Sequence, residues 1–418
     1  MTPVNTVALR DWLRRERGLD LADYDALRRW SVEHLADFWQ AMWDHFDLHS
    51  PTPHSAVLSG AAMPGARWFA GAQLNYAAQV VRHAGSSAPA LVFRNERLQR
   101  EGRSRDIGWA DLADQVAALA ATLRSLGVQR GDRVAAYLPN VPQAAVAFLA
   151  CASIGAIWSM TAPDMGVGTV RDRFRQIDPK VLIACDGSVY GGKVNDRRAT
   201  AVELLHELPT VHTLLWVPVL DDAGAPGGPF ALDVGAWPGR VLGWADALAT
   251  TERVAPEPVP FEHPLWIVYS SGTTGLPKPI VHGHGGVVLE MLKLHAFHLN
   301  LQPSDRSDER FLWYSSTGWV MWNLALSSLL RGTTVCLYDG HPSFPGDDAL
   351  WRYAADVGAT FVGAGAAYFA GCLKAGLEPK RLGLERVRAL GSTGSPLSPD
   401  CYDWGWQQVK PDLWWAVI

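Results

Sequence analysis

Apolar positions follow two alternating patterns along most of the chain after about residue 110. Leu112, Val116, Leu119 and Leu123 recur at helical spacing, and Gly127 follows as a helix stop signal. Short apolar runs rich in β-branched and aromatic residues come next, at residues 133–139, 154–160, 180–186, 212–218, 265–271 and 333–339. Runs of this kind are typical of buried strands in parallel sheets. The alternation therefore predicts an α/β fold with two parallel-sheet lobes and helices on both faces of each sheet.

The chain before residue 100 has a different pattern. Residues 31–46 place seven apolar side chains on one face of a single predicted helix: Val32, Leu35, Phe38, Trp39, Met42, Trp43 and Phe46. Three prolines then interrupt regular structure, at Pro51, Pro53 and Pro64. We therefore expect residues 1–100 to form an N-terminal helical cap on a larger domain, residues 101–418.

Two further segments affect the predicted architecture. Residues 144–158 are almost continuously apolar, but a membrane span needs roughly 18 to 20 such residues. We expect a buried helix that leads into a strand there. Residues 221–260 are rich in Gly, Pro and Ala, with one short helical piece near Trp244, and are predicted to form a loop between the two lobes.

Composition excludes several classes of protein. The 418 residues are 48% hydrophobic and 19% charged, with a formal net charge of −5, so no basic surface for nucleic acid is indicated. The five cysteines are widely spaced and form no CxxC pair, which favours buried free thiols in a reducing compartment. The first 18 residues carry charges where a signal peptide needs an apolar run. We expect a cytoplasmic protein without a membrane span.

The clearest chemical signal is the string YSSGTTGLPKP at residues 269–279, directly after an apolar run. Its hydroxyl residues and glycines supply O–H and N–H donors with room for close approach to an anion. Lys278 adds a positive charge suited to phosphate. The Walker A pattern is not met, because no glycine precedes Lys278 and no hydroxyl residue follows it. The string therefore predicts a phosphate-binding loop of another type.

This string resembles the phosphate-loop motif of the adenylate-forming superfamily, which includes acyl-CoA synthetases, luciferases and adenylation domains. Residues 68–77 (WFAGAQLNYA) resemble the N-terminal signature of its acetyl-CoA and acetoacetyl-CoA synthetase branch. Residues 153–166, 316–323 and 391–398 most resemble the acetoacetate–CoA ligase members. The resemblance covers the chain from about residue 30 onward.

The resemblance implies a role for each matching position. The residues that would hold the β- and γ-phosphates of ATP are Ser270, Ser271, Gly272, Thr273, Thr274, Gly275 and Lys278, with Thr274 and Lys278 as catalytic groups. Those that would line the adenine are Gly394, Ser395 and Pro396. The acyl pocket would be shaped by Trp319, Val320, Met321 and Thr393. Tyr190 and Lys193 match positions where relatives place basic residues on the 3′-phosphate of coenzyme A.

The pattern of apolar and polar positions alone would assign some of these residues a structural role or no specific role. Trp319 and Trp322, three residues apart, would both be core residues, and Lys193 would be a solvated surface lysine. His282 and His284 have no carboxylate or cysteine nearby in the sequence, so we assign them a structural role and predict no metal-binding site.

The implied reaction has two steps. A carboxylate, acetoacetate or a similar short oxo-acid, attacks the α-phosphorus of MgATP to give an acyl-adenylate and pyrophosphate, and coenzyme A then displaces AMP. The partners would be small molecules only: ATP with Mg²⁺, the acid and coenzyme A. Two alternatives stay open, another short-chain acyl-CoA synthetase for acetate or propionate, and a non-catalytic nucleotide-binding protein.

The family pattern continues beyond the last residue, Ile418, with a Gly/Thr/acid motif and a mobile C-terminal domain. We therefore expect a truncated adenylate-forming domain that lacks those parts. The chain by itself is expected to have little or no activity.

Overall fold

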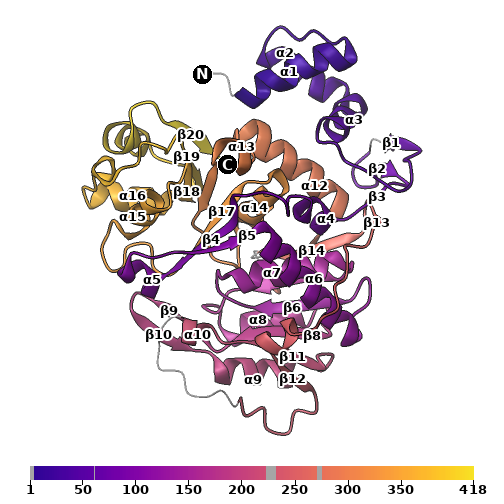
Figure 1. Cartoon of the computed structure of the whole chain (residues 1–418), viewed down its shortest axis with the longest axis vertical. Helices are drawn as coiled ribbons and strands as arrows, with labels where there is room; N and C mark the ends of the chain where they lie inside the picture. Colours follow the sequence, from indigo (N-terminus) through magenta and orange to yellow (C-terminus); the bar gives the residue numbers. More distant parts are fainter. Residues whose placement is uncertain (1–3, 61, 223–231, 271–274) are drawn as a thin grey trace.

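The computed structural model describes residues 4–60, 62–222, 232–270 and 275–418. Within these residues, two seven-stranded sheets form the body of the molecule (Figure 1). The first sheet has the order β12-β11-β8-β6-β7-β14-β15, and every neighbouring pair is parallel except β14 and β15. Its strands are β6 (Arg133–Tyr137), β7 (Ile157–Thr161), β8 (Val181–Cys185), β11 (Thr213–Val217), β12 (Arg240–Gly243), β14 (Pro264–Ser270) and β15 (Lys278–Gly283).

The second sheet has the order β20-β19-β18-β16-β17-β4-β5, and only β4 and β5 are antiparallel. Its strands are β4 (Pro89–Asn95), β5 (Arg105–Gly108), β16 (Arg310–Trp313), β17 (Thr334–Asp339), β18 (Phe361–Gly365), β19 (Ala389–Thr393) and β20 (Trp414–Val417). The predicted pair of mostly parallel sheets is confirmed. Because β4 pairs with β17, a strand that precedes residue 100 belongs to the second sheet, and the domain boundary at residue 100 stays a prediction.

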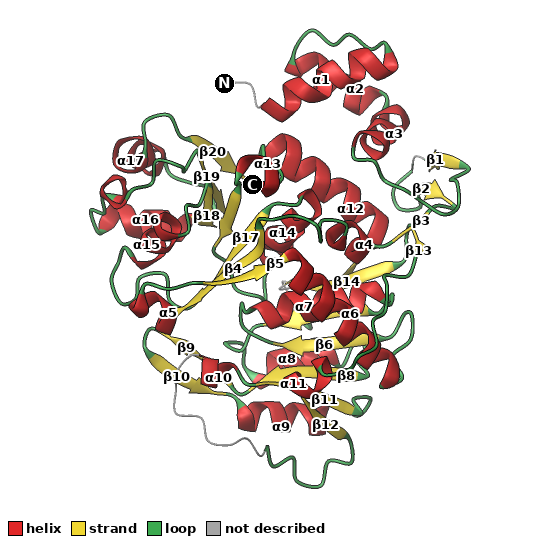
Figure 2. Ribbon diagram, viewed as in Figure 1, coloured by secondary structure: helices red, strands yellow, loops and turns green. Residues whose placement is uncertain are grey.

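Helices cover both faces of each sheet (Figure 2). Successive residues of one strand join different cores: Leu182 packs with helices α8 and α9, whereas Ile183 packs with α6 and α7. In the second sheet, Leu312 packs with α15 and α16, and Phe311 packs with α14. These helices are α6 (Trp109–Ser125), α7 (Pro142–Ser153), α8 (Val167–Phe174), α9 (Arg198–Glu207), α14 (Val320–Ser327), α15 (Ala349–Asp356) and α16 (Ala366–Lys374).

The apolar stretch 144–158 is α7 followed by β7, as expected, and every α7 side chain except Gln143 is buried. The remaining helices are short or connect the lobes: α4 (Tyr76–Val81), α5 (Glu96–Glu101), α10 (Val219–Asp222), α11 (Trp244–Leu248), α12 (His284–Lys293), α13 (Ser304–Ser307) and α17 (Pro399–Trp404). The remaining strands pair outside the two large sheets: β1 (Ala56–Ser59), β2 (Arg67–Ala70), β3 (Gln73–Leu74), β9 (Gly187–Tyr190), β10 (Lys193–Asp196) and β13 (Val259–Pro260).

The N-terminal cap consists of α1 (Val4–Arg17), α2 (Tyr24–Glu33) and α3 (Leu35–His45). The predicted single helix over residues 31–46 is therefore wrong, because the backbone leaves the helical conformation at His34. Val32 and Leu35 lie on either side of this break and are exposed, although their spacing continues the apolar pattern. The later part of the pattern does form the contact face, where Trp43 stacks on Phe69.

Residues 221–260 do not connect the two lobes, so that prediction is wrong for their described part. They contain β12, which pairs with β11 at the edge of the first sheet, and the chain then returns to β14 of the same sheet. Glycine and proline content indicates irregular backbone, but it carries no information about which strands the segment connects. The chain passes between the lobes elsewhere, through α6 and through α12.

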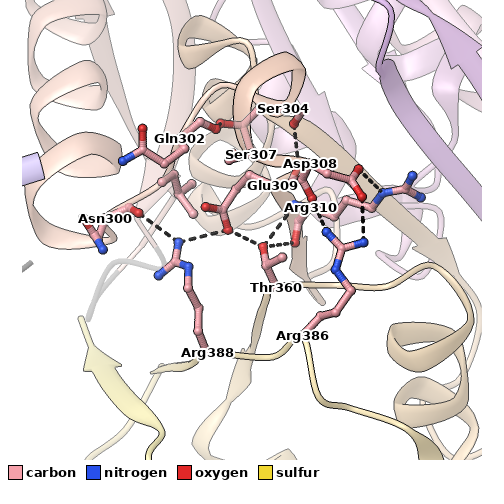
Figure 3. Close-up of polar contacts among 12 residues, drawn as sticks. Asn300, Gln302, Ser304, Ser307, Asp308, Glu309, Arg310, Thr360, Arg386 and Arg388 are labelled. Carbon is pink, nitrogen blue, oxygen red and sulfur yellow. Dashed lines mark hydrogen bonds and ion pairs between the residues drawn. The ribbon is translucent and has the colours of Figure 1, made fainter. Parts of the chain in front are cut away.

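The amino ends of three strands in the second sheet are joined by a buried polar network (Figure 3). Glu309, Thr360 and Arg388 directly precede β16, β18 and β19. The Glu309 carboxylate accepts hydrogen bonds from Arg388 Nη2 at 3.0 Å and from the Thr360 hydroxyl. Arg388 also donates to the Asn300 carbonyl at 2.9 Å. Nearby, Arg386 forms an ion pair with Asp308 at 2.7 Å. This end of the sheet is closed by paired charges.

Candidate functional site

A cavity of about 880 Å³ lies at the opposite, carboxyl ends of the strands. Its walls come from both lobes: the segments after β6 and β7 and the β9–β10 hairpin on one side, and the segments after β16, β17, β18 and β19 on the other. Open α/β sheets bind ligands in the crevice beyond the carboxyl ends of their strands. The volume is within the range typical of small-molecule sites.

Six of the sequence-predicted residues line this cavity: Tyr190, Trp319, Val320, Met321, Thr393 and Gly394. Tyr190 comes from the hairpin of the first lobe and the other five from the second lobe. The two tryptophans at three-residue spacing have different environments. Trp322 is 2% exposed and donates to Asn140 Oδ1 at 3.0 Å, whereas Trp319 is 65% exposed at the start of α14. The pattern-based interpretation as core holds for Trp322 only.

Other predicted residues do not line the cavity. Lys193 is exposed at the start of β10, and Ser395 and Pro396 are exposed beyond the end of β19. Ser270 and Lys278 are register partners at the ends of β14 and β15, where Lys278 is exposed.

The rest of the predicted phosphate loop is described only in part. Gly275 has φ +96°, a conformation that glycine adopts readily. Gln176 donates to the carbonyl of Pro277 at 2.9 Å and so holds this side of the loop against the first lobe. Ser271, Gly272, Thr273 and Thr274 lie outside the described residues. The assigned roles of the whole set in ATP binding and catalysis stay predictions.

Two acidic residues at this end of the second sheet were not predicted, the half-buried Asp339 and the buried Glu96. Asp339, the last residue of β17, lines the cavity, and burial together with the charge of Glu96 raises the pKa of its carboxyl to about 7. A signal was present in the sequence, because Asp339 ends one of the runs predicted to be a buried strand. Polar residues at that position of a parallel strand face the ligand crevice.

Glu96, the first residue of α5, joins the two lobes. Its buried carboxylate accepts backbone N–H groups from Gly191 at 2.6 Å, Gly192 at 2.8 Å and His341 at 2.8 Å. Gly191 and Gly192 form the turn of the β9–β10 hairpin, with φ near +61° and +75°. A side chain at Gly192 would lie 2.7 Å from the Phe344 ring. Nothing in the sequence links these segments, because Glu96 lies about a hundred residues from the turn.

Two side chains fix the wall formed by the segment after β7. The Tyr137 hydroxyl donates to the carbonyl of Pro163 at 2.8 Å, and Arg197 Nε donates to the same carbonyl at 2.6 Å. Burial raises the pKa of Tyr137 to about 12, so its hydroxyl stays protonated and continues to donate. On the opposite wall, Tyr314 donates to the carbonyl of Gly340 at 3.0 Å. The cavity is thus bounded by hydrogen-bonded rather than loose segments.

His282 and His284 have structural partners, as expected. His282 Nδ1 accepts from Trp266 Nε1 at 2.8 Å, and the buried His284 Nδ1 accepts from the backbone N–H of Tyr76 at 3.1 Å. Among the described residues, no group of three or more His, Cys, Asp or Glu side chains is arranged to hold a metal ion. The five cysteines are all buried and free. Within the described part of the chain, each helix is too short or too polar to cross a membrane.

Comparison with known proteins agrees with this architecture. The AMP-binding enzyme model matches residues 77–415, and the model of the acetyl-coenzyme A synthetase N-terminus matches residues 24–80. The chain is 40% identical over 416 residues to acetoacetyl-coenzyme A synthetase of Rhizobium meliloti (strain 1021), covering 98% of this chain and 60% of that protein. It is 36% identical over 408 residues to acetoacetyl-CoA synthetase of Gallus gallus, covering 95% and 58%.

A solved structure, acetoacetyl-CoA synthetase from Streptomyces lividans, superposes with a TM-score of 0.91 at 45% identity, covering 99% of this chain and 62% of that one. The chain therefore spans about 60% of the length of the relatives it matches. The family model covers most of the chain and includes the strands from both lobes that border the cavity. The chain belongs to the AMP-binding enzyme family.

Proposed function

We propose that this protein takes part in the ATP-dependent conversion of acetoacetate to acetoacetyl-CoA through an acyl-adenylate. The observation that carries the proposal is the match of nearly the whole chain to acetoacetyl-CoA synthetases at 36–45% identity. The cavity between the lobes supports it, because six residues assigned from the family resemblance meet on its walls. Acetate and propionate synthetases, the first alternative, are not favoured by these relatives.

In the first step, a carboxylate oxygen of acetoacetate attacks the α-phosphorus of ATP, and the bond to pyrophosphate breaks. The acid lies against Trp319, Val320, Met321 and Thr393, with the adenine near Gly394, Ser395 and Pro396. The phosphate loop, residues 270–278, donates to the leaving pyrophosphate, with Thr274 and Lys278 stabilising its developing charge. Such reactions depend mainly on positioning and on stabilisation of negative charge.

In the second step, the sulfur of coenzyme A attacks the acyl carbon, the bond to AMP breaks, and the thiol proton passes to water. The cavity has room for more than a four-carbon acid, which supports a second ligand on the hairpin side near Tyr190. Mg²⁺ would accompany ATP as its counter-ion. Because no described cluster is arranged to hold a metal, no step is assigned to protein-bound Mg²⁺. A cytoplasmic location is part of the proposal, supported by the five free buried thiols.

The test measures pyrophosphate release with ATP and a panel of acids: acetoacetate, 3-hydroxybutyrate, acetate and propionate. Isothermal titration with a non-reactive acyl-adenylate mimic gives a second readout that needs no turnover. We expect tighter binding of the acetoacetyl mimic than of the acetyl mimic. Pyrophosphate release from this chain is expected to be slow, and the release that occurs should depend on acetoacetate. Preference for acetate would support the acetyl or propionyl alternative. Binding of ATP without binding of any acyl-adenylate mimic would support the nucleotide-binding alternative.

A further inference from the structure

Arg197 contributes a cationic side chain to the cavity wall. Among the described residues that line the cavity, it is the only one with a Lys, Arg or His side chain. It lies between β10 and α9, on the wall formed by the first lobe, whereas Thr393 and Gly394 belong to the wall of the second lobe. An anionic ligand that enters on this side therefore meets one cationic group.

The guanidinium of Arg197 is fixed in place but not neutralised. Nε donates to the Pro163 carbonyl at 2.6 Å, and Nη1 donates weakly to the Asp196 carbonyl at 3.4 Å. An arginine has five N–H donors, so some stay available besides those used for the two carbonyls and for the Tyr137 hydroxyl. Within the described part of the chain, no carboxylate forms an ion pair with Arg197. A half-buried guanidinium held by carbonyls is preorganised to bind an external anion.

The next residue shows the opposite arrangement. Arg198 is exposed and binds the Asp196 carboxylate through Nε, at 2.9 Å to one carboxylate oxygen and 3.1 Å to the other. The Asp196 carboxylate therefore forms its ion pair with Arg198, and it attracts Arg197 only through space. The two adjacent arginines have equal charge but differ in whether their N–H donors are available to an external anion. Arg198 completes a surface ion pair, whereas Arg197 presents unused donors to the cavity.

We propose that Arg197 binds a phosphate group of coenzyme A, either the diphosphate or the 3′-phosphate. This inference rests on the proposed function, since it takes coenzyme A as the second ligand of the cavity. It replaces Lys193 as the main cationic contact, because Arg197 lines the cavity and the exposed Lys193 does not. Guanidinium matches phosphate in geometry as well as in charge.

Two carboxylates on the cavity wall act against anion binding. Asp164 follows the Pro163 carbonyl that Arg197 binds, and Asp339 lies on the wall of the second lobe. Both would repel phosphate placed beside them, which restricts the favourable position to the vicinity of Arg197. Asp339 is partly protonated at neutral pH, so its repulsion is reduced there.

The experiment is a calorimetric titration of the 418-residue chain with three ligands. Coenzyme A carries all phosphates, dephospho-CoA lacks the 3′-phosphate, and pantetheine lacks every phosphate. Arg197→Gln is compared with Arg198→Gln, which removes the same charge from the adjacent position, and with Lys193→Gln. Arg197→Lys retains the charge, and thermal unfolding verifies that each variant is folded.

We expect Arg197→Gln to weaken coenzyme A binding about tenfold or more, as loss of a charge-assisted contact does. Arg198→Gln and Lys193→Gln change it less than about twofold, in line with exposed charges. Pantetheine binding stays unchanged, and Arg197→Lys binds better than Arg197→Gln. If dephospho-CoA binds wild type and Arg197→Gln equally, the 3′-phosphate is the group bound. An equal loss with dephospho-CoA identifies the diphosphate.

The inference is overturned by unchanged coenzyme A binding in Arg197→Gln, by an equal loss of pantetheine binding, or by absence of coenzyme A binding to the wild type. Failure of the proposed function has a different signature. The acyl-adenylate mimic then fails to bind, while the phosphate-dependent effect of Arg197 on coenzyme A remains.

Discussion

The two ends of the second sheet use charge in opposite ways. At the amino ends of the strands, the buried Glu309 carboxylate is matched by Arg388 and by the Thr360 hydroxyl (Figure 3). At the carboxyl ends, two carboxylates, Glu96 and Asp339, lie near each other, and no Lys, Arg or His of the described chain forms an ion pair with either. Removing one partner of a buried ion pair is strongly destabilising, whereas carboxylates with shifted pKa values and no cationic partner are frequent where a ligand binds. The first end joins three strands through paired charges, whereas the second borders the cavity.

The largest expected loss of stability comes from breaking the ion pair between Arg388 and Glu309 at the amino ends of the strands. Arg388→Gln leaves the Glu309 carboxylate buried without its cation, and we expect unfolding in urea to be easier by about 3 kcal/mol. Arg386→Gln, which breaks the exposed pair with Asp308, costs less than about 1 kcal/mol. Binding of the acyl-adenylate mimic stays near wild type in both variants. Equal costs for the two variants would contradict the importance of burial at this end.

An effect of opposite sign, which depends on pH, is expected from Asp339→Asn. The pKa of Asp339 is raised in the folded state, so the folded protein holds a proton that the unfolded chain releases between about pH 4 and pH 7. Wild-type stability therefore falls as pH rises through this window. The variant lacks this loss, so its stability relative to wild type rises from equality near pH 4 to an upper bound of about 4 kcal/mol at pH 8. Urea unfolding across pH measures the difference, and a constant difference would refute the shift.

Glu96→Gln tests the contact between the lobes. The amide retains an acceptor oxygen but turns an N–H group toward backbone donors, so we expect a loss of about 1 to 2 kcal/mol. Faster hydrogen exchange at Gly191 and Gly192 would locate the change, whereas an unrelated surface change would leave these amides protected. Because the Glu96 charge contributes to the raised pKa of Asp339, the pH window of that residue moves downward in this variant.

The smallest effect on stability is expected at Trp319. Its side chain is 65% exposed, so Trp319→Ala changes the free energy of unfolding by less than about 0.5 kcal/mol. Trp322→Ala, in contrast, removes a buried ring and costs about 3 to 5 kcal/mol. In Trp319→Ala, discrimination between acetoacetyl and butyryl mimics should decrease. A variant with unchanged discrimination would remove Trp319 from the acyl pocket.

Much of the fold could be predicted, because buried strands and helices leave local periodicity. The runs at 180–186 and 333–339 became β8 and β17 with little change. Local pattern failed where a single backbone conformation decided the result, as at His34. It also failed for strand order, since nothing in residues 221–260 indicates that β12 pairs with β11.

The candidate site was predictable where a motif carried it and not where it depends on distant contacts. Trp319 and Thr393 come from recognisable strings. The hydrogen bonds of Glu96 to Gly191 and His341 join segments about 95 and 245 residues apart. No sequence pattern indicated a role for Arg197 either. That role depends on the ion pair between Asp196 and Arg198, which leaves Arg197 without one. Such relations exist only in the folded chain.

The contact of Glu96 with three backbone amides has a consequence for redesign of the protein. The turn cannot change length without disturbing the N–H groups of Gly191 and Gly192, and a side chain at Gly192 would meet the Phe344 ring. Variation aimed at admitting larger ligands is therefore better placed at the start of α14, where Trp319 and Val320 are exposed. The hairpin is the fixed wall of the cavity, and α14 is the adjustable one.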